Sequence, residues 1–322
     1  MSPARARAGP RRPRRKDLSV NDTRFGVFLS PHRDNGLITD SAQAAESSGF
    51  DFATVQDHPY VPDFLDPYVL ISHLAARTST LRFLTDVANL PLRPAPLLAK
   101  TAASLDVLSR GRFDLGLGGG RSWPQIAGLG GPTWTPGQTV NAIDEAITVL
   151  RAMWEPRPSV TFPGTTYSLD AVATGPAPVH PVGIWLGASG PRMLDLLGRR
   201  ADGWIAPLAT PFETKPAAQD AIDAAARAAG RSPRDIRRVI QLVGSVTGST
   251  APVDLPLSGP NGRPVHANPD QWARIIAHFV TEQRFDAVNL VPERETPDQI
   301  SLFGEHVIPA ARRLVADQSR AA

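Results

Sequence analysis

Length, composition and charge narrow the possible classes of protein. The chain has 322 residues, no Cys, and a formal net charge of +3. The missing cysteines exclude a disulfide framework and a thiolate nucleophile, and no apolar run approaches the roughly 20 residues of a transmembrane helix. Residues 1–16 hold seven basic residues and no acid, so the rest carries 3 − 7 = −4. We therefore expect a soluble, cytoplasmic protein with a mildly acidic body.

The basic segment at the start has two interpretations. Arginine clusters attract phosphate, so it could be a nucleic-acid arm. Its three prolines and its lack of an apolar pattern favour a disordered tail over residues 1–22, followed by one domain over residues 23–322. An export signal is disfavoured because no apolar stretch follows the paired arginines. We prefer the disordered tail and do not expect nucleic acid as a partner.

Eight short apolar runs predict β-strands, with helix-like stretches between most of them. The runs occupy residues 23–29, 51–56, 81–87, 113–118, 183–187, 203–206, 238–246 and 286–291. Strands that alternate with helices indicate parallel pairing with both faces of the sheet covered. Eight such units in about 300 residues predict an α/β fold, a closed (β/α)8 TIM barrel. In this fold the functional residues lie at the C-terminal ends of the strands.

The helix pattern predicts eight helices and two interruptions. The helices cover residues 39–48, 67–77, 94–109, 136–154, 191–200, 216–229, 269–283 and 297–315, and most begin near a proline, which suits a first helical turn. Residues 155–181 predict a hairpin or long loop after the fourth strand unit. Residues 247–268 are polar and rich in Gly and Pro, which predicts a long loop after strand seven.

The second predicted strand ends in Asp57 and His58, the one place where an acid and a histidine meet at a strand terminus. A histidine moves protons near neutral pH, and an adjacent carboxylate can set its tautomer and raise its pKa. The alternative is a pair that only anchors a loop. His32 follows the first strand and could face the same site.

The fourth strand runs into a glycine series, Gly118, Gly119 and Gly120, followed by Arg121. A dinucleotide fingerprint is rejected because Arg121 stands where the third glycine belongs, and Trp123-Pro124 does not look like a clean helix start. The glycines could let a flat ring or a phosphate approach the backbone. The alternative is a packing turn beneath a large loop.

After the fifth strand, Ser189 and Gly190 precede a predicted helix that starts at Pro191, with Arg192 next. Free backbone N–H groups and the positive end of the helix dipole favour an anion at such a turn. An ordinary capped helix is the alternative. HExxH, GxSxG and Walker A sequences do not occur, and we expect no metal site.

Three stretches together resemble the bacterial luciferase-like family of flavin- and deazaflavin-dependent oxidoreductases. They are ESSGFDFATVQDH from residue 46, the long block over residues 66–120 that ends in GRFDLGLGGG, and GASGPRMLDLLGRRADGWI from residue 187. A weaker match, FDAVNLVP, starts at residue 285. The resemblance covers roughly residue 23 to the C-terminus.

The resemblance implies a barrel that binds FMN or the deazaflavin coenzyme F-420 at its mouth. It places the ring near Asp57 and His58 and near a bulge with a non-prolyl cis peptide at Asp86, Val87, Ala88 and Asn89. It places the phosphate near Ser189, Gly190 and Arg192. The Asp-His pair is more similar to the deazaflavin branch. Some deazaflavin dehydrogenases have a proton-transferring Glu at the position of Arg121, and an Arg cannot act as that acid.

We therefore expect an oxidoreductase that transfers a hydride between F-420 or FMN and a small organic substrate. His58, Asp57 and Arg121 are the candidate catalytic residues, with Arg121 receiving an anionic group. One alternative is a monooxygenase that uses reduced FMN from a separate flavin or deazaflavin reductase. Another is a barrel that binds the cofactor without turnover. The resemblance also implies a homodimer.

Overall fold

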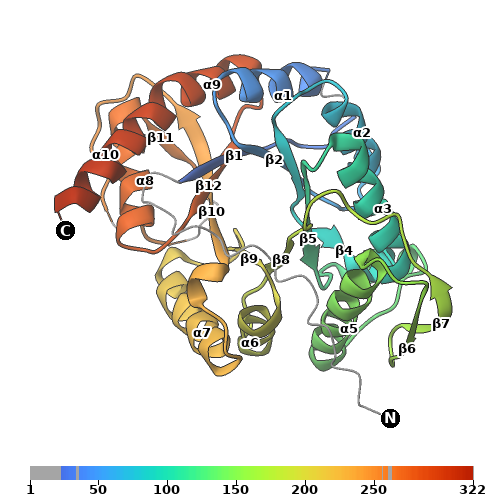
Figure 1. The fold of residues 1–322 in the computed structure, drawn as a ribbon. Helices are drawn as coiled ribbons and strands as arrows, with labels where there is room; N and C mark the ends of the chain where they lie inside the picture. Colours follow the sequence, from blue (N-terminus) through green and yellow to red (C-terminus); the bar gives the residue numbers. More distant parts are fainter. Residues whose placement is uncertain (1–22, 34–35, 256, 260–262, 322) are drawn as a thin grey trace, which may run out of the picture.

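The computed structural model describes residues 23–33, 36–255, 257–259 and 263–321. The predicted basic tail over residues 1–22 and parts of the predicted loop over residues 247–268 lie outside the described residues. Figure 1 shows the strands enclosed by a ring of helices.

Eight parallel strands form a closed barrel, as the apolar runs predict. The strands, in pairing order, are β1 (Arg24–Phe28), β2 (Phe52–Val55), β3 (Arg82–Thr85), β5 (Phe113–Gly118), β8 (Ile184–Gly187), β9 (Gly203–Ile205), β10 (Arg237–Val246) and β12 (Ala287–Pro292). The register between β12 and β1 closes the ring, with Val288 opposite Phe25. The bounds of each predicted strand are confirmed to within two residues. The prediction succeeds because both faces of a barrel strand are covered, so each strand appears in the sequence as an apolar run.

Helices follow the strands, and most begin at or beside a proline. They are α1 (Ile38–Ser47), α2 (Pro67–Ala75), α3 (Ala95–Ser109), α5 (Pro136–Trp154), α6 (Pro191–Arg200), α7 (Lys215–Ala228) and α8 (Pro269–Thr281). Capping boxes at Thr135 and Asn268 start α5 and α8 by satisfying the free N–H groups of the first turn. Among the described residues, no helix is long and apolar enough to cross a membrane.

Two helix predictions differ from the structure. The single helix predicted over residues 297–315 is instead α9 (Pro297–Leu302), a π-helix (Phe303–Val307) and α10 (Ile308–Ala321). A Cβ at Gly304 would lie 2.3 Å from Ser48 Oγ, so the π-turn occurs where the chain passes closest to α1. The prediction that Trp123-Pro124 starts no helix was wrong, because a short helix, α4 (Trp123–Gly128), begins there.

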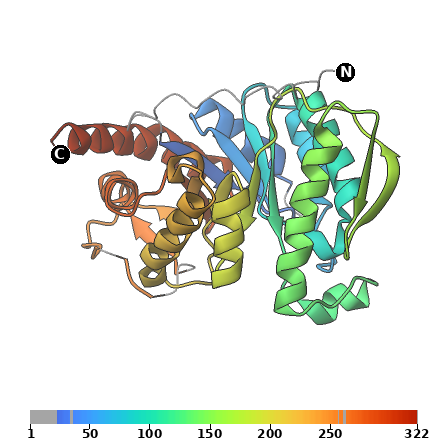
Figure 2. The same cartoon turned by 60° about the horizontal axis from the view of Figure 1, so that its bottom comes forward.

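Smaller elements occupy the two predicted interruptions and the loops. The antiparallel hairpin of β6 (Ser159–Pro163) and β7 (Ser168–Ala173) lies within residues 155–181, beside α5 (Figure 2). The Glu145 carboxylate on α5 accepts hydrogen bonds from the backbone N–H groups of Thr165, Thr166 and Tyr167, at 2.8–3.0 Å. In the part of the chain that the structure describes, the remaining short elements are β4 (Ala88–Asn89), β11 (Val265–Ala267) and three 3-10 turns (Leu90–Leu92, Phe212–Thr214 and Pro233–Asp235).

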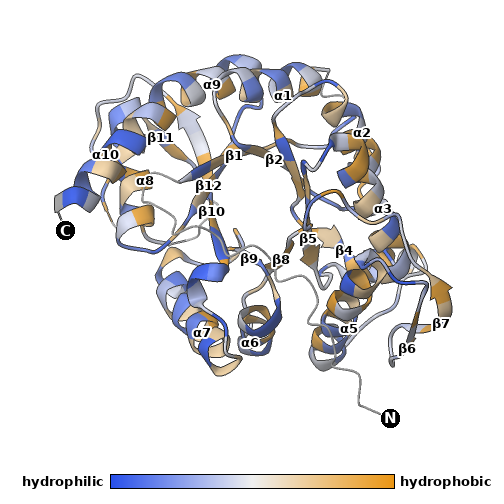
Figure 3. Ribbon diagram, in the orientation of Figure 1, coloured by the Kyte–Doolittle hydropathy of each residue, from blue (hydrophilic) through white to orange (hydrophobic). Residues whose placement is uncertain are grey.

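The main core lies between the strands and the helices. Outward-facing strand residues such as Phe25, Val27, Phe113 and Leu115 are fully buried there. In Figure 3 apolar and hydrophilic colours alternate along the barrel strands, and the helices carry both colours. The apolar contacts therefore fix the helices on the barrel and leave its interior to residues of other kinds.

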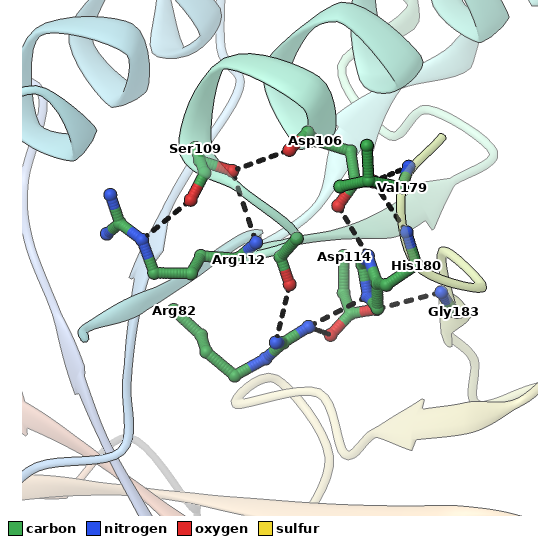
Figure 4. Close-up of polar contacts among 9 residues, drawn as sticks. Arg82, Asp106, Ser109, Arg112, Asp114, Val179, His180 and Gly183 are labelled. Atoms are coloured by element: carbon green, nitrogen blue, oxygen red, sulfur yellow. Dashed lines mark hydrogen bonds and ion pairs between the residues drawn. The ribbon is translucent and has the colours of Figure 1, made fainter. Parts of the chain in front are cut away.

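A buried charge cluster around His180 joins α3, β5 and the segment that enters β8 (Figure 4). The imidazole contacts the carboxylates of Asp106 and, at 3.3 Å, Asp114. Asp106 also accepts the backbone N–H groups of Val179 and His180, at 2.7 and 3.1 Å. Burial lowers the pKa of His180, but the hydrogen bonds to the two carboxylates outweigh burial and raise this pKa to about 9.

The His180 cluster predicts a pH-dependent stability. A histidine whose folded-state pKa is raised contributes stability fully below its unfolded pKa of 6.5 and loses it as the pH rises through about 9. His180→Gln should therefore lower the free energy of unfolding by about 2 kcal/mol near pH 6 and by much less near pH 10. Urea unfolding measures both values, with the exposed His73→Gln as a control. Equal losses at the two pH values would contradict this prediction.

Candidate functional site

The candidate site lies at the C-terminal ends of the barrel strands, where this fold places its chemistry. A cavity of about 990 Å³ opens at the opposite end, lined by residues at or beside the starts of the strands. Its charged side chains pair with one another, such as Arg24 with Asp51 at 2.6 Å and Arg82 with Asp114 at 2.9 Å. Because these charges are internally neutralised, we assign the cavity to the structural end of the barrel.

His58 follows β2 and is partly buried among aromatic rings. Its imidazole stacks with Tyr60, at 5.4 Å between ring centroids, and with Phe64, at 6.5 Å. His32 packs edge-on against Phe64 at 6.0 Å, so the predicted histidine after the first strand joins the same aromatic group. Burial lowers the pKa of His58 below 6.5, and this effect exceeds the opposing effect of the Asp57 charge. The expected rise of this pKa was wrong, and His58 is neutral at pH 7.

Asp57 is fully buried and pairs with Arg93 instead of orienting His58. Its two carboxylate oxygens accept hydrogen bonds from Arg93 Nε and Nη2, at 3.1 and 2.9 Å. Oδ2 also accepts the backbone N–H of Asn89 at 2.9 Å. Arg93 donates further to Asp66, the N-cap of α2, at 2.6 Å. Asp57 therefore fixes the chain after β3 against the end of β2, which is a positioning role.

Asp86 lies where β3 ends and faces the barrel interior. The peptide bond between Asp86 and Val87 is cis, as the resemblance implies. Its carboxylate lies 3.5 Å from Asn289 Nδ2 on β12, and the same amide donates to Thr54 Oγ1 on β2 at 2.9 Å. Burial raises the pKa of Asp86 to about 7, against a smaller lowering by a hydrogen bond from Thr54. Ala88 and Asn89, the other two predicted residues of the bulge, are buried and pair with β5.

The glycine series after β5 packs against protein side chains. A Cβ at Gly118 would lie 2.4 Å from Val87 Cγ2, one at Gly119 2.2 Å from Thr139 Cγ2, and one at Gly120 2.7 Å from Pro91 Cγ. The glycines are therefore required by neighbouring side chains, which supports the packing turn. Arg121 is exposed directly after them.

The turn after β8 has the open geometry that an anion site needs. Gly190 is the N-cap of α6, Pro191 is its first residue, and a Cβ at Gly190 would meet no atom within 4 Å. Ser189, Gly190 and Arg192 are all exposed, and the helix dipole directs its positive end at this turn. Val87 lies close to this region, since a Cβ at Gly187 would be 3.4 Å from its methyl groups.

The structure also brings together polar residues that sequence reasoning missed. Thr54, Gln241 and Asn289 are buried within apolar strands, and Gln241 lies opposite Asn289 in the register of β10 and β12. A second acid–histidine pair, His266 with Glu293, lies at the ends of β11 and β12. The signal for the buried residues was a single polar residue inside each apolar run. The second pair gave no local signal, because its members are far apart in sequence.

Comparison with known proteins shows which proteins this chain resembles in sequence. A family model described as luciferase-like monooxygenase matches residues 23–252. The F-420-dependent hydroxymycolic acid dehydrogenase of Mycobacterium tuberculosis is 33% identical over 67% of this chain and 61% of its own length. The 5,10-methylenetetrahydromethanopterin reductase of Methanolobus tindarius is 31% identical over 66% of this chain and 62% of its own. The matched regions thus span about three fifths of these relatives.

Solved structures share the fold. An F-420-dependent secondary alcohol dehydrogenase in complex with an F-420–acetone adduct superposes with a TM-score of 0.76 at 20% identity, covering 90% of this chain and 99% of that one. The EDTA monooxygenase of Chelativorans sp. BNC1 gives 0.75 at 16%, covering 93% and 94%. At these identities the likeness concerns the fold alone. The family match, by contrast, covers well over half of the sequence, and the chain therefore belongs to the luciferase-like monooxygenase family.

Proposed function

We propose that the protein is an oxidoreductase that transfers a hydride between coenzyme F-420, or FMN, and a small organic substrate. The observation that carries this proposal is the mouth of the barrel, where the partly buried His58 follows β2 and the polar Asp86 follows β3. Val87, the next residue, packs beside Gly187 at the end of β8, which leads into the open N-terminus of α6. Family membership and the F-420-dependent dehydrogenase among the relatives support it.

The residues present fit a phosphorylated ring cofactor. Ser189, the Gly190 turn and Arg192 would hold its phosphate, because this helix start is open and no side chain caps it. The Asp86–Val87 segment would contact the ring. Among the described residues, the buried Oδ1 atoms of Asn89 and Asn289 accept no hydrogen bond and could accept one from a bound molecule. The bound cofactor supplies the atom that carries the hydride, C5 of the deazaflavin or N5 of FMN.

His58 would hydrogen-bond the substrate or the ring through an imidazole N–H. Its stacking between Tyr60 and Phe64 fixes the ring plane, and burial keeps it neutral, so it offers one donor and one acceptor. The Asp57–Arg93 pair holds the neighbouring backbone in place. The exposed Arg121 would attract an anionic group of the substrate and cannot supply a proton.

Two partner proposals accompany this function. Reduced cofactor would come from a separate flavin or deazaflavin reductase if the direction of turnover requires it. A homodimer is supported by apolar side chains exposed on α2 and α3, since Val69, Leu97 and Leu108 are 65–77% exposed. Leu97 and Leu108 lie three helical turns apart and so share one face of α3. Exposed apolar side chains mark a contact between subunits where they form one contiguous patch.

The cofactor proposal is tested by binding isotherms with F-420 and with FMN. Arg192→Ala should weaken both tenfold to a hundredfold, which corresponds to the roughly 1.5–3 kcal/mol of a charged hydrogen bond. Analogues that lack the phosphate, such as riboflavin, should lose little. Arg199→Ala, an exposed arginine in the last turn of the same helix, is the matched control. Equal losses with and without the phosphate would refute the phosphate assignment, and binding of neither cofactor would refute the function.

The role of His58 predicts a change in turnover instead of stability. His58→Asn should lower kcat by roughly a hundredfold while the cofactor Kd changes less. Single-turnover rates and melting temperatures of His58→Asn and His58→Ala measure this. Unchanged rates in folded, cofactor-loaded variants would remove His58 from the mechanism.

The dimer proposal is tested on the exposed face of α3. Leu108→Glu should shift the protein from dimer to monomer in size-exclusion chromatography with light scattering, because a charge on this face would be buried unpaired in the interface. Leu302→Glu on α9, also at an exposed leucine, should leave the mass unchanged. A monomeric wild type would show that the face has another purpose.

A further inference from the structure

Asp86 differs from the other buried carboxylates of the structure in its surroundings. Asp57 pairs with Arg93, Asp106 with His180, and Asp223 with Arg238. Among the described residues, Asp86 takes part in no such ion pair, and its neighbours Thr54 and Asn289 are both uncharged. The 3.5 Å separation from Asn289 Nδ2 is at the outer limit of a hydrogen bond. A carboxylate placed this way is poorly stabilised as an anion.

The direction of the Asp86 side chain follows from the alternation of β3. Arg82, Leu84 and Asp86 share one face of the strand, and the first two line the cavity at the N-terminal end of the barrel. Asp86 is enclosed by protein and keeps some exposed surface, yet it does not line that cavity. Because it directly follows the last residue of β3, it lies at the C-terminal end of the barrel.

Few charged groups approach Asp86 from the elements around it. On β2 the nearest ionisable side chains are Asp57, paired with Arg93, and His58, which is neutral at pH 7. On β5 the inward-facing acid is Asp114, at the other end of the barrel and paired with Arg82. On β12 the next ionisable residue is Glu293, which pairs with His266 beyond the strand end. The polar groups that contact Asp86 itself are thus neutral ones.

We propose that Asp86 is an acid–base residue of this site that exchanges a proton with the oxygen of a carbonyl–alcohol substrate pair. The inference rests on the proposed function. In the oxidative direction the substrate C–H bond would break, and the oxidised cofactor of the proposed function would accept its electron pair as hydride. The O–H bond breaks, its proton passes to the Asp86 carboxylate, and C=O forms. In the reverse direction neutral Asp86 gives its proton to the carbonyl oxygen as the hydride arrives at carbon.

The environments of Asp86 and His58 support this division of roles. Burial raises the pKa of the acid to about 7 and lowers that of the histidine, so the usual order of the two groups is reversed. Near neutral pH the carboxyl is present in both forms, whereas the imidazole stays neutral. Asp86 also lies at the end of a rigid strand, held by its own N–H to Val55 O at 2.8 Å. Arg121, exposed after β5, keeps its proton at neutral pH and cannot supply one to the substrate.

The decisive variant is Asp86→Asn, which keeps the shape of the side chain and removes its proton chemistry. We expect kcat/KM with an alcohol or ketone substrate to fall about a hundredfold and the limb of the pH–rate profile near pH 7 to disappear. The cofactor Kd should change little. Asp40→Asn, at an exposed carboxyl on α1, is the matched control.

A second readout needs no turnover. A carboxyl whose pKa rises from 3.8 unfolded to about 7 folded binds its proton more tightly in the folded state. The contribution of Asp86 to the unfolding free energy should therefore fall as the pH rises between these values, and the difference between the wild type and Asp86→Asn measures it, with a slope of up to one proton. Asp86→Asn should lose this slope, and the infrared band of a protonated carboxyl that titrates near pH 7 in the wild type should be absent.

The outcomes separate the two proposals. A wild type that binds neither F-420 nor FMN overturns the proposed function. A wild type that binds and turns over, with an Asp86→Asn variant that keeps both the pH–rate limb and the stability slope, overturns the role of Asp86 alone. If Asp86→Asn loses the stability slope but keeps the pH–rate profile, the proposed role of Asp86 is also overturned, because Asp86 would then be only a buried acid.

Discussion

The pair between Asp57 and Arg93 is the interaction on which the arrangement of the site depends. It ties the end of β2 to the chain that follows β3, so it sets where His58 lies relative to the segment from Asp86 to Asn89. Removing one partner of such a buried pair typically costs about 3–5 kcal/mol, because the other charge remains without compensation. Asp57 thus holds the neighbouring backbone in position, and its carboxylate does not restrain the His58 imidazole. A strand-end Asp-His sequence does not by itself distinguish these roles.

Val87 provides the second constraint, and it explains why Gly118 carries no side chain. A Cβ at Gly118 would lie 2.4 Å from Val87 Cγ2, so the end of β5 must stay bare where the chain after β3 passes it, whereas a Cβ at Gly187 would make an ordinary contact of 3.4 Å. Gly120 has a φ of +86°, a conformation that few other residues adopt. The glycine series therefore shapes the mouth indirectly, by admitting Val87, Thr139 and Pro91, whereas the turn at Gly190 has open space beside it.

The fold could be predicted from the sequence because its signals are local. Each barrel strand is an apolar run, and each boundary was found within two residues. The short helix at Trp123 and the π-turn at Phe303 were missed, because neighbouring segments decide them. The site was harder to predict from the sequence, because many of its contacts join distant segments. Asp57, His58 and the Gly190 turn are visible as local patterns, whereas the partner of Asp57, the pocket of Asp86 and the Glu293–His266 pair depend on contacts between distant segments.

The titratable groups at the two ends of the barrel differ in their surroundings. We connect the ion-paired groups with stability, and the buried Asp86 and His58 with the proposed chemistry. At the N-terminal end, arginines and aspartates such as Arg82 and Asp114 neutralise one another, and two carboxylates hold His180 in its charged form. At the C-terminal end Asp57 is likewise paired, with Arg93, but burial drives Asp86 and His58 toward their neutral forms. A paired charge resists a change of protonation, because losing the proton also loses the pair. A neutral acid among uncharged partners has no such restraint, so protons move most readily at the end of the barrel where the cofactor and substrate would meet.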